Sequence, residues 1–158
     1  MANLGWLWSS ETCLALQAVL LQPSKLDNYK KMFELTVEAD FSAAHRLKTV
    51  NKKCERLHGH NWKVQLFLSG KKVDKTGILL DFKEAKSRLK EVITPLDHTY
   101  LNEIPFFKRI SPTSENIAFY LYQKLKGLFA KNKGIKVAKV TVWESETTAA
   151  SYFGEKNE

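Results

Sequence analysis

Cysteine is scarce in this chain of 158 residues, which contains only Cys13 and Cys54. Two cysteines cannot build the disulfide framework of a small secreted domain, so the composition fits a reducing compartment, and we expect the cytoplasm. No apolar stretch reaches the roughly 18 residues that a membrane-spanning helix needs, so we expect no membrane partner. A chain of this length can bury a sizeable core without covalent cross-links.

Dense runs of basic residues are also missing, although the net charge is +8, from 25 Lys and Arg against 17 Asp and Glu. No segment interleaves basic and aromatic side chains as a nucleic-acid platform does, so we expect no nucleic-acid partner. The positive excess suits either a solvated lysine-rich surface or attraction of a phosphorylated small molecule.

Residues 1–31 differ from the rest of the chain. Gly5-Trp6-Leu7-Trp8 precedes a nearly all-apolar run from Leu14 to Leu21. This run lacks a preceding basic region and a clear cleavage site after it, which argues against a signal peptide. We interpret residues 1–31 as an N-terminal extension, either an appended amphipathic helix or a segment upstream of a natural start at Met32. Residues 32–158 are expected to form a single domain.

Hydrophobic periodicity predicts the secondary structure of that domain. Apolar patterns typical of strands occur at residues 32–40, 61–69, 78–82 and 137–144. Helical spacing occurs at 82–93, where Pro95 should end the helix, and from a Ser/Thr-rich cap at 111–115 to about residue 130. This order predicts an α+β fold, an antiparallel four-stranded sheet with two helices on one face.

Histidine is rare, yet three of the four histidines lie close together in the sequence. His58 and His60 flank one glycine at the start of a predicted strand, where residues two apart point to the same face. His45 would lie beside them if the first two strands pair. Three imidazoles suit zinc and leave a fourth position open for water or substrate. Iron or nickel would also accept three imidazoles. Taken without His45, the pair His58 and His60 could equally be ordinary polar residues on the surface.

Cys54 lies four residues before His58. It could close a structural zinc site as a fourth ligand, or act as an acid/base residue whose thiolate is favoured by nearby positive charge. Replacing Cys54 should release the metal in the first case and leave it bound in the second.

The pattern C-x-x-x-H-G-H, preceded by F-S-A-A-H at residues 41–45, resembles the family of 6-pyruvoyltetrahydropterin synthases and 6-carboxytetrahydropterin synthases. The likeness runs from Phe33 to about Tyr152. Further motifs follow in the family's order, namely GILLDF at 77–82, LDHTYLN at 96–102, PTSEN at 112–116 and VWES at 142–145.

The resemblance implies the tunnelling fold (T-fold), in which sheets join into a barrel by oligomerisation. It implies a homohexamer built from two trimers, with active sites at subunit interfaces. It also implies zinc ligation by His45, His58 and His60, in agreement with their spacing.

Roles in acid–base chemistry follow from the same resemblance. Cys54 is expected to abstract a proton, and Asp97 to orient His98, which shuttles it. Glu144 is expected to be a catalytic residue that also anchors the pterin ring by accepting two parallel hydrogen bonds. Without the family, Glu144 would be interpreted as a solvent-facing strand residue.

The segment Thr113, Ser114 and Glu115 is expected to help line the pterin pocket. The same residues suit a helix N-cap, and the two roles can coexist.

The family divides by product. The short spacing between Cys54 and His58 resembles the bacterial type that converts 7,8-dihydroneopterin triphosphate to 6-carboxy-5,6,7,8-tetrahydropterin for queuosine, and we predict this reaction. The alternatives are 6-pyruvoyltetrahydropterin synthesis and side-chain cleavage to 6-hydroxymethyl-7,8-dihydropterin for folate. Glu55 beside Cys54 resembles the cleavage type, and we expect it to modify the reaction. A non-catalytic zinc- or pterin-binding module is the alternative outside enzymes.

Overall fold

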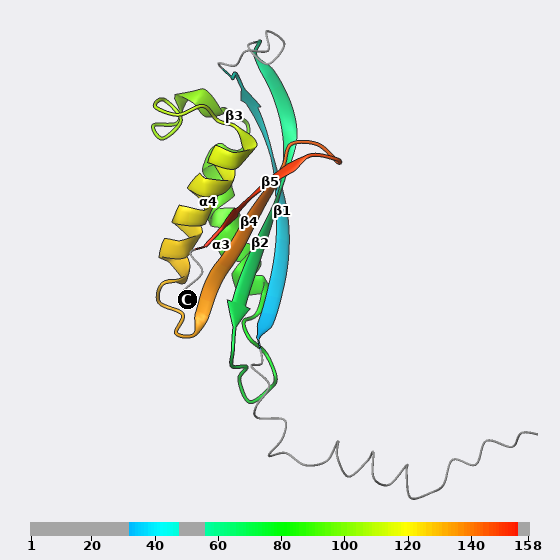
Figure 1. Ribbon diagram of the computed structural model, residues 1–158, viewed down its shortest axis with the longest axis vertical. Helices are drawn as coiled ribbons and strands as arrows, with labels where there is room; N and C mark the ends of the chain where they lie inside the picture. The colour runs from blue at the N-terminus through cyan, green and yellow to red at the C-terminus, as the bar shows by residue number, and fades with distance from the viewer. Residues whose placement is uncertain (1–31, 48–55, 155–158) are drawn as a thin grey trace, which may run out of the picture. The chain divides into compact units, whose positions relative to one another are not determined.

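A five-stranded sheet carries two helices on one of its faces (Figure 1). The computed structural model describes residues 32–47 and 56–154. The strand order in the sheet is β3-β1-β2-β4-β5. The elements are β1 (Phe33–His45), β2 (His58–Gly70), α3 (Phe82–Ile93), η1 (Thr94–Leu96), β3 (Thr99–Tyr100), η2 (Leu101–Glu103), α4 (Ser114–Phe129), β4 (Ile135–Trp143) and β5 (Ala149–Phe153). The predicted α+β class is confirmed.

The long antiparallel pair β1–β2 forms the centre of the fold. Its register runs without a break from Phe33 opposite Gly70 to His45 opposite His58. Alternate side chains on both strands are buried against the helices, as period two requires. Both strands extend beyond the predicted ranges, because pairing satisfies the backbone of their polar ends. The histidines therefore lie on paired strand ends, where the backbone is fixed.

Side-chain caps start both helices. The Asp81 carboxylate accepts a hydrogen bond from the Lys83 N–H, and the Thr113 hydroxyl accepts one from the Asn116 N–H. Helix α3 contacts β1, and α4 contacts β4 and β5, so the two helices cover one face between them. Predicted and observed bounds agree for α3, and the short 3₁₀ helix η1, which contains Pro95, follows it.

The strand predicted at residues 78–82 is wrong. Ile78 is 49% exposed, Leu80 is buried and Asp81 already caps α3. The Asp74 carboxylate accepts hydrogen bonds from the Thr76 and Ile78 N–H groups, which closes a turn instead. The apolar run therefore covers one edge of the core and leads into the helix.

The sheet has five strands rather than the four predicted, because the strand at 78–82 is absent and both β3 and β5 were missed. Strand β3 pairs in parallel with Ala43 and Ala44 of β1, and β5 pairs antiparallel with β4. No helix within residues 32–47 and 56–154 is long and apolar enough to cross a membrane. The barrel formed by oligomerisation stays a prediction.

Candidate metal centre

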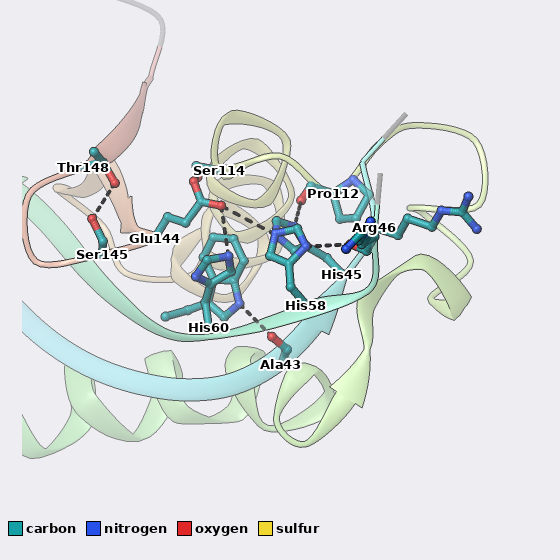
Figure 2. Close-up of polar contacts among 12 residues, drawn as sticks. Ala43, His45, Arg46, His58, His60, Pro112, Ser114, Glu144, Ser145 and Thr148 are labelled. Atoms are coloured by element: carbon teal, nitrogen blue, oxygen red, sulfur yellow. Dashed lines mark hydrogen bonds and ion pairs between the residues drawn. The ribbon is translucent and has the colours of Figure 1, made fainter. Parts of the chain in front are cut away.

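Three histidine side chains converge at the end of the β1–β2 pair, on the face that the helices cover (Figure 2). His45 is opposite His58, and His60 is opposite Ala43, so strand alternation sends all three rings to one face. The Nε2 atoms of His45 and His58 are 2.9 Å apart. The expected convergence of the three rings is therefore present, and it depends on strand register.

The second nitrogen of two of these rings is held by a main-chain carbonyl. His45 Nδ1 lies 2.8 Å from the Pro112 oxygen, and His58 Nδ1 lies 2.7 Å from the Arg56 oxygen. A carbonyl can only accept, so each Nδ1 carries the proton and donates it. In the neutral rings, both Nε2 lone pairs then face each other, and a cation between them satisfies both. Carbonyl partners of this kind orient metal-binding histidines.

The third ring contributes a buried atom without a partner. His60 Nε2 has no hydrogen-bond partner within the described part of the chain. It lies 3.2 Å from Glu144 Oε1, but not with hydrogen-bond geometry. Buried polar atoms are nearly always satisfied in proteins, so this orphaned nitrogen points to a bound group.

Burial keeps two of the rings in the form that binds metal. Burial lowers the pKa of His45 below its ordinary value of 6.5, and the neighbouring rings of His58 and His60 lower it further. Burial also lowers the pKa of His60, against the opposing effect of the Glu144 carboxylate. Both rings are therefore neutral near pH 7, with a lone pair available for coordination.

A carboxylate completes the cluster. One donor atom from each of His45, His58, His60 and Glu144 lies within 4.8 Å of the others. Three imidazole nitrogens and a carboxylate oxygen suit zinc in tetrahedral geometry, and they also suit other divalent transition metals. The donor set and the orphaned nitrogen both fit a metal ion here.

Glu144 lies just beyond the end of β4 and is not a solvent-facing strand residue. Its side chain is 32% exposed, and Oε1 turns toward the rings of His45 and His60. The Ser114 hydroxyl donates to Oε2 at 3.4 Å, so the N-terminus of α4 also contacts this carboxylate. Thr113 takes the predicted N-cap role, and Glu115 is exposed in the first turn of the helix.

The predicted Asp97–His98 pair lies at the edge of β1. His98 is 82% exposed, and its Nε2 lies 3.7 Å from Asp97 Oδ2. Asp97 Oδ1 accepts the Ser42 N–H, and the His98 N–H donates to the Ser42 oxygen. These bonds hold His98 in a left-handed backbone conformation with φ of 53°.

His98 borders a cavity of about 470 Å³ whose lining includes Ser42, Gly59 and Asn61. These three residues alternate with the metal-facing positions, so their side-chain directions lie on the opposite face of the sheet. Gly59 accordingly faces away from the metal cluster, although His60 of that cluster also lines the cavity. The structure does not bring His98 into the group of donor atoms formed by the three histidines and Glu144.

Two predicted site residues, Cys54 and Glu55, lie outside the described residues. Three residues that orient the histidine rings were not predicted from the sequence. Two of them, Arg56 and Pro112, act only through their main-chain carbonyl groups. The third, Trp62, packs edge-on against His45 and His60 and donates its indole N–H to the Ala43 oxygen at 3.2 Å. Trp62 continues the same-face alternation of His58 and His60, and that signal was available in the sequence.

Together, fold and site define an α+β protein with a cluster of four side chains that could hold a metal ion at the end of a long strand pair. The sequence model of the 6-pyruvoyl tetrahydropterin synthase family matches residues 34–155. The chain therefore belongs to this family of pterin-processing enzymes.

Individual relatives agree with that assignment. An Archaeoglobus fulgidus protein provisionally named 6-carboxy-5,6,7,8-tetrahydropterin synthase is 40% identical over 110 residues, which cover 70% of this chain and 86% of that protein. The human 6-pyruvoyl tetrahydrobiopterin synthase is 32% identical over 129 residues, which cover 73% of this chain and 87% of the human protein. The solved structure of the Caenorhabditis elegans 6-pyruvoyl tetrahydropterin synthase superposes with a TM-score of 0.69 at 31% identity, covering 79% of this chain and 97% of that one.

Proposed function

We propose that this protein is a zinc-dependent 6-carboxy-5,6,7,8-tetrahydropterin synthase acting on 7,8-dihydroneopterin triphosphate, within the queuosine pathway of the cytoplasm. The observation that carries the proposal is the convergence of the three histidine side chains on one point. The Nδ1 atoms of His45 and His58 each donate to a main-chain carbonyl, which leaves their Nε2 atoms for a metal. Relatives in Archaeoglobus fulgidus and Synechocystis bear the name of this synthase, the first provisionally. The human relative's name supports 6-pyruvoyl product formation as the second candidate.

The domain that performs this reaction is proposed to span residues 32–158, with residues 1–31 as an extension. The family match at residues 34–155 supports that boundary. Zinc bound by His45, His58 and His60 would act as a Lewis acid that lowers the pKa of substrate side-chain hydroxyls.

The residues around the metal are proposed to divide recognition from proton transfer. The Glu144 carboxylate accepts two hydrogen bonds from the pterin ring, while Thr113, Ser114 and Glu115 line the pocket at the start of α4. Cys54 abstracts a proton, with Glu55 as a modifier of the outcome. His98 carries the proton onward, and Asp97 holds its ring.

We propose that Asp97 and His98 complete the centre of a neighbouring copy in a homohexamer. Support comes from the hydrogen bond of Asp97 to Ser42 of β1 and from His98, which is 82% exposed and lies outside the group of metal-donor atoms. Beyond Ala43 and Ala44, the outer edge of β1 has no strand partner within the described chain. Unpaired edges favour strand pairing between copies, as barrel closure by oligomerisation would provide.

The test is to incubate the zinc-loaded protein with 7,8-dihydroneopterin triphosphate and identify the product by mass spectrometry. We expect 6-carboxy-5,6,7,8-tetrahydropterin, and we expect Cys54→Ala to abolish it while zinc stays bound. A 6-hydroxymethyl-7,8-dihydropterin product that Glu55→Gln abolishes would assign the protein to side-chain cleavage. A folded, zinc-loaded protein without turnover would overturn the enzyme proposal and favour a pterin-binding module.

A further inference from the structure

We propose that Asn102 is a positioning residue of the metal centre, whose carboxamide takes the place of a neighbouring strand at the end of β1 and fixes the main chain next to His45. Asn102 contributes no atom to the donor group formed by the three histidines and Glu144. The inference rests on the proposed function, because it assumes that the three histidines hold a divalent metal.

The Asn102 side chain binds both main-chain polar groups of Arg46, the residue that directly follows His45. The Arg46 N–H donates to Asn102 Oδ1 at 2.9 Å, and Asn102 Nδ2 donates to the Arg46 oxygen at 2.9 Å. A main-chain N–H can only donate and a carbonyl can only accept, so only this orientation of the amide makes both bonds. A carboxamide carries the same donor and acceptor as a peptide group, so it can pair with a strand residue as a neighbouring strand does.

The end of β1 needs such a partner because β3 is too short to supply one. Strand β3 pairs with β1 only at Ala43 and Ala44, and the chain then turns into η2. Leu101, the first residue of η2, is buried in the core and holds this turn in place. Asn102 comes next, beside the edge of β1, and extends the pairing to Arg46.

A second side chain pairs with β1 in the same way before β3 begins. Asp97 Oδ1 accepts the Ser42 N–H at 2.8 Å, and the His98 N–H donates to the Ser42 oxygen. Two side chains of one motif, those of Asp97 and Asn102, therefore lengthen a two-residue strand in both directions. The motif LDHTYLN at residues 96–102 thus fastens the outer edge of β1 over its last residues.

The main chain at His45 is consequently held from both edges of β1. His45 is opposite His58 of β2, while Asn102 holds Arg46 on the other edge. Metal–ligand distances tolerate departures of only about 0.2 Å, and a strand end that is free to fray cannot hold a ring to that precision. Because β1 ends at His45, the ring depends on this fixation. Asn102 acts on the metal through the position of His45.

The two bonds contribute little to global stability, which separates a positioning role from a purely structural one. Both are exposed to solvent. In Asn102→Ala, water can replace the side chain at both polar groups of Arg46, so the melting temperature should change little. Water does not fix the direction of a strand end, so the loss should be seen at the metal.

The test uses Co²⁺ in place of zinc, because the visible absorption of Co²⁺ reports the geometry of its ligands. Wild type is compared with Asn102→Ala, and Asn132→Ala is the matched control. Asn132 Oδ1 also accepts a hydrogen bond, from Arg88 at 2.7 Å, but it lies beyond the C-terminus of α4, whereas the metal cluster lies at the N-terminus of that helix.

We expect Asn102→Ala to lower Co²⁺ affinity about tenfold, as for other outer-shell partners of metal ligands. Its absorption spectrum should differ from wild type even at saturating Co²⁺, because the position of one ligand has changed. Asn132→Ala should lower the melting temperature at least as much as Asn102→Ala, since its bond is part-buried. Its Co²⁺ affinity and spectrum should match those of the wild type.

Hydrogen exchange in the metal-free protein tests the contact without any metal. We expect the Arg46 amide to exchange faster in Asn102→Ala than in wild type, because its acceptor is lost. The same amide should be unchanged in Asn132→Ala. Equal exchange in wild type and Asn102→Ala would overturn the proposed pairing at the end of β1.

The outcomes separate this inference from the proposed function. Wild-type protein that binds no Co²⁺ would overturn the metal centre, and the role of Asn102 with it. Identical affinity and spectra in wild type and Asn102→Ala would overturn the positioning role alone and leave the proposed function standing. An equal loss of affinity in Asn132→Ala would show that general destabilisation, rather than the position of His45, weakens metal binding, and would also overturn it.

Discussion

The Nε2 atoms of His45 and His58 lie 2.9 Å apart, while both rings use Nδ1 to donate to main-chain carbonyls. Both rings are thus oriented before any ligand arrives, and their facing lone pairs are unfavourable until a cation lies between them. A metal ion bound between the two Nε2 atoms would relieve this repulsion. Stability should therefore depend on the metal.

Metal removal should lower the melting temperature, and zinc should restore it. At a free zinc concentration 100 times the dissociation constant, binding to the native state alone stabilises by about 2.7 kcal/mol. Differential scanning calorimetry with and without chelator measures this shift. His60→Asn should reduce the response to zinc, whereas His98→Asn should keep it. An equal response in both variants would contradict the assigned cluster.

Replacing Trp62 by Phe should weaken metal binding without removing a ligand. The indole packs edge-on against His45 and His60 and donates to the Ala43 oxygen. Phenylalanine keeps much of the packing but leaves that oxygen without its donor, which costs about 1 kcal/mol of unfolding free energy. Zinc affinity should fall about tenfold, as for other outer-shell partners of metal-binding histidines. Unchanged affinity by competition titration would mean that Trp62 only fills the core.

Asp97 should prove to have two separable roles, because its two oxygens face different groups. Oδ1 accepts the Ser42 N–H, and Oδ2 faces His98. Asp97→Asn can keep an acceptor for Ser42, whereas Asp97→Ala cannot, so Ala should be less stable by about 1 kcal/mol in urea unfolding. Both variants should lose most product formation, since neither supplies a carboxylate to His98. Full activity in Asp97→Asn would reduce Asp97 to a structural anchor.

Backbone strain at His98 should be measurable. A side chain at φ of 53° costs about 1–2 kcal/mol relative to glycine, partly offset by the greater freedom of glycine in the unfolded chain. His98→Gly and His98→Ala both remove the imidazole, but only glycine relieves the strain. We expect His98→Gly to be more stable than His98→Ala by about 1 kcal/mol, with both inactive. Equal stability would show that the conformation is unstrained.

Local signals in the sequence predicted the helices well. The bounds of α3 were predicted from apolar spacing and Pro95, which act within a few residues, and the structure adds the N-cap at Asp81. Strand β5 was missed because its small side chains at Ala149–Ser151 give no clear alternation. The false strand at 78–82 shows that a short apolar run does not identify its own partner.

The part of the site that was predicted from the sequence is the part built from side chains that are close together in the chain. The spacing of His58 and His60 predicted a shared face, but the arrival of His45 needed the β1–β2 register. The carbonyls of Arg56 and Pro112 could not be predicted, because every residue has a carbonyl and only the fold selects these two. The approach of Glu144 to the rings likewise arises from tertiary packing.

The register of β1 and β2 has a consequence for how this family diversifies. Strand pairing alone fixes where His45 meets His58, whatever the sequence between them contains. Cys54, which we propose abstracts a proton, and Glu55, which we propose modifies the outcome, belong to that intervening sequence. If the proposed roles hold, metal ligands and base lie on separable pieces of chain. Exchange of the base, or a change in the length of the segment that carries it, would then alter the product while the histidine cluster is retained.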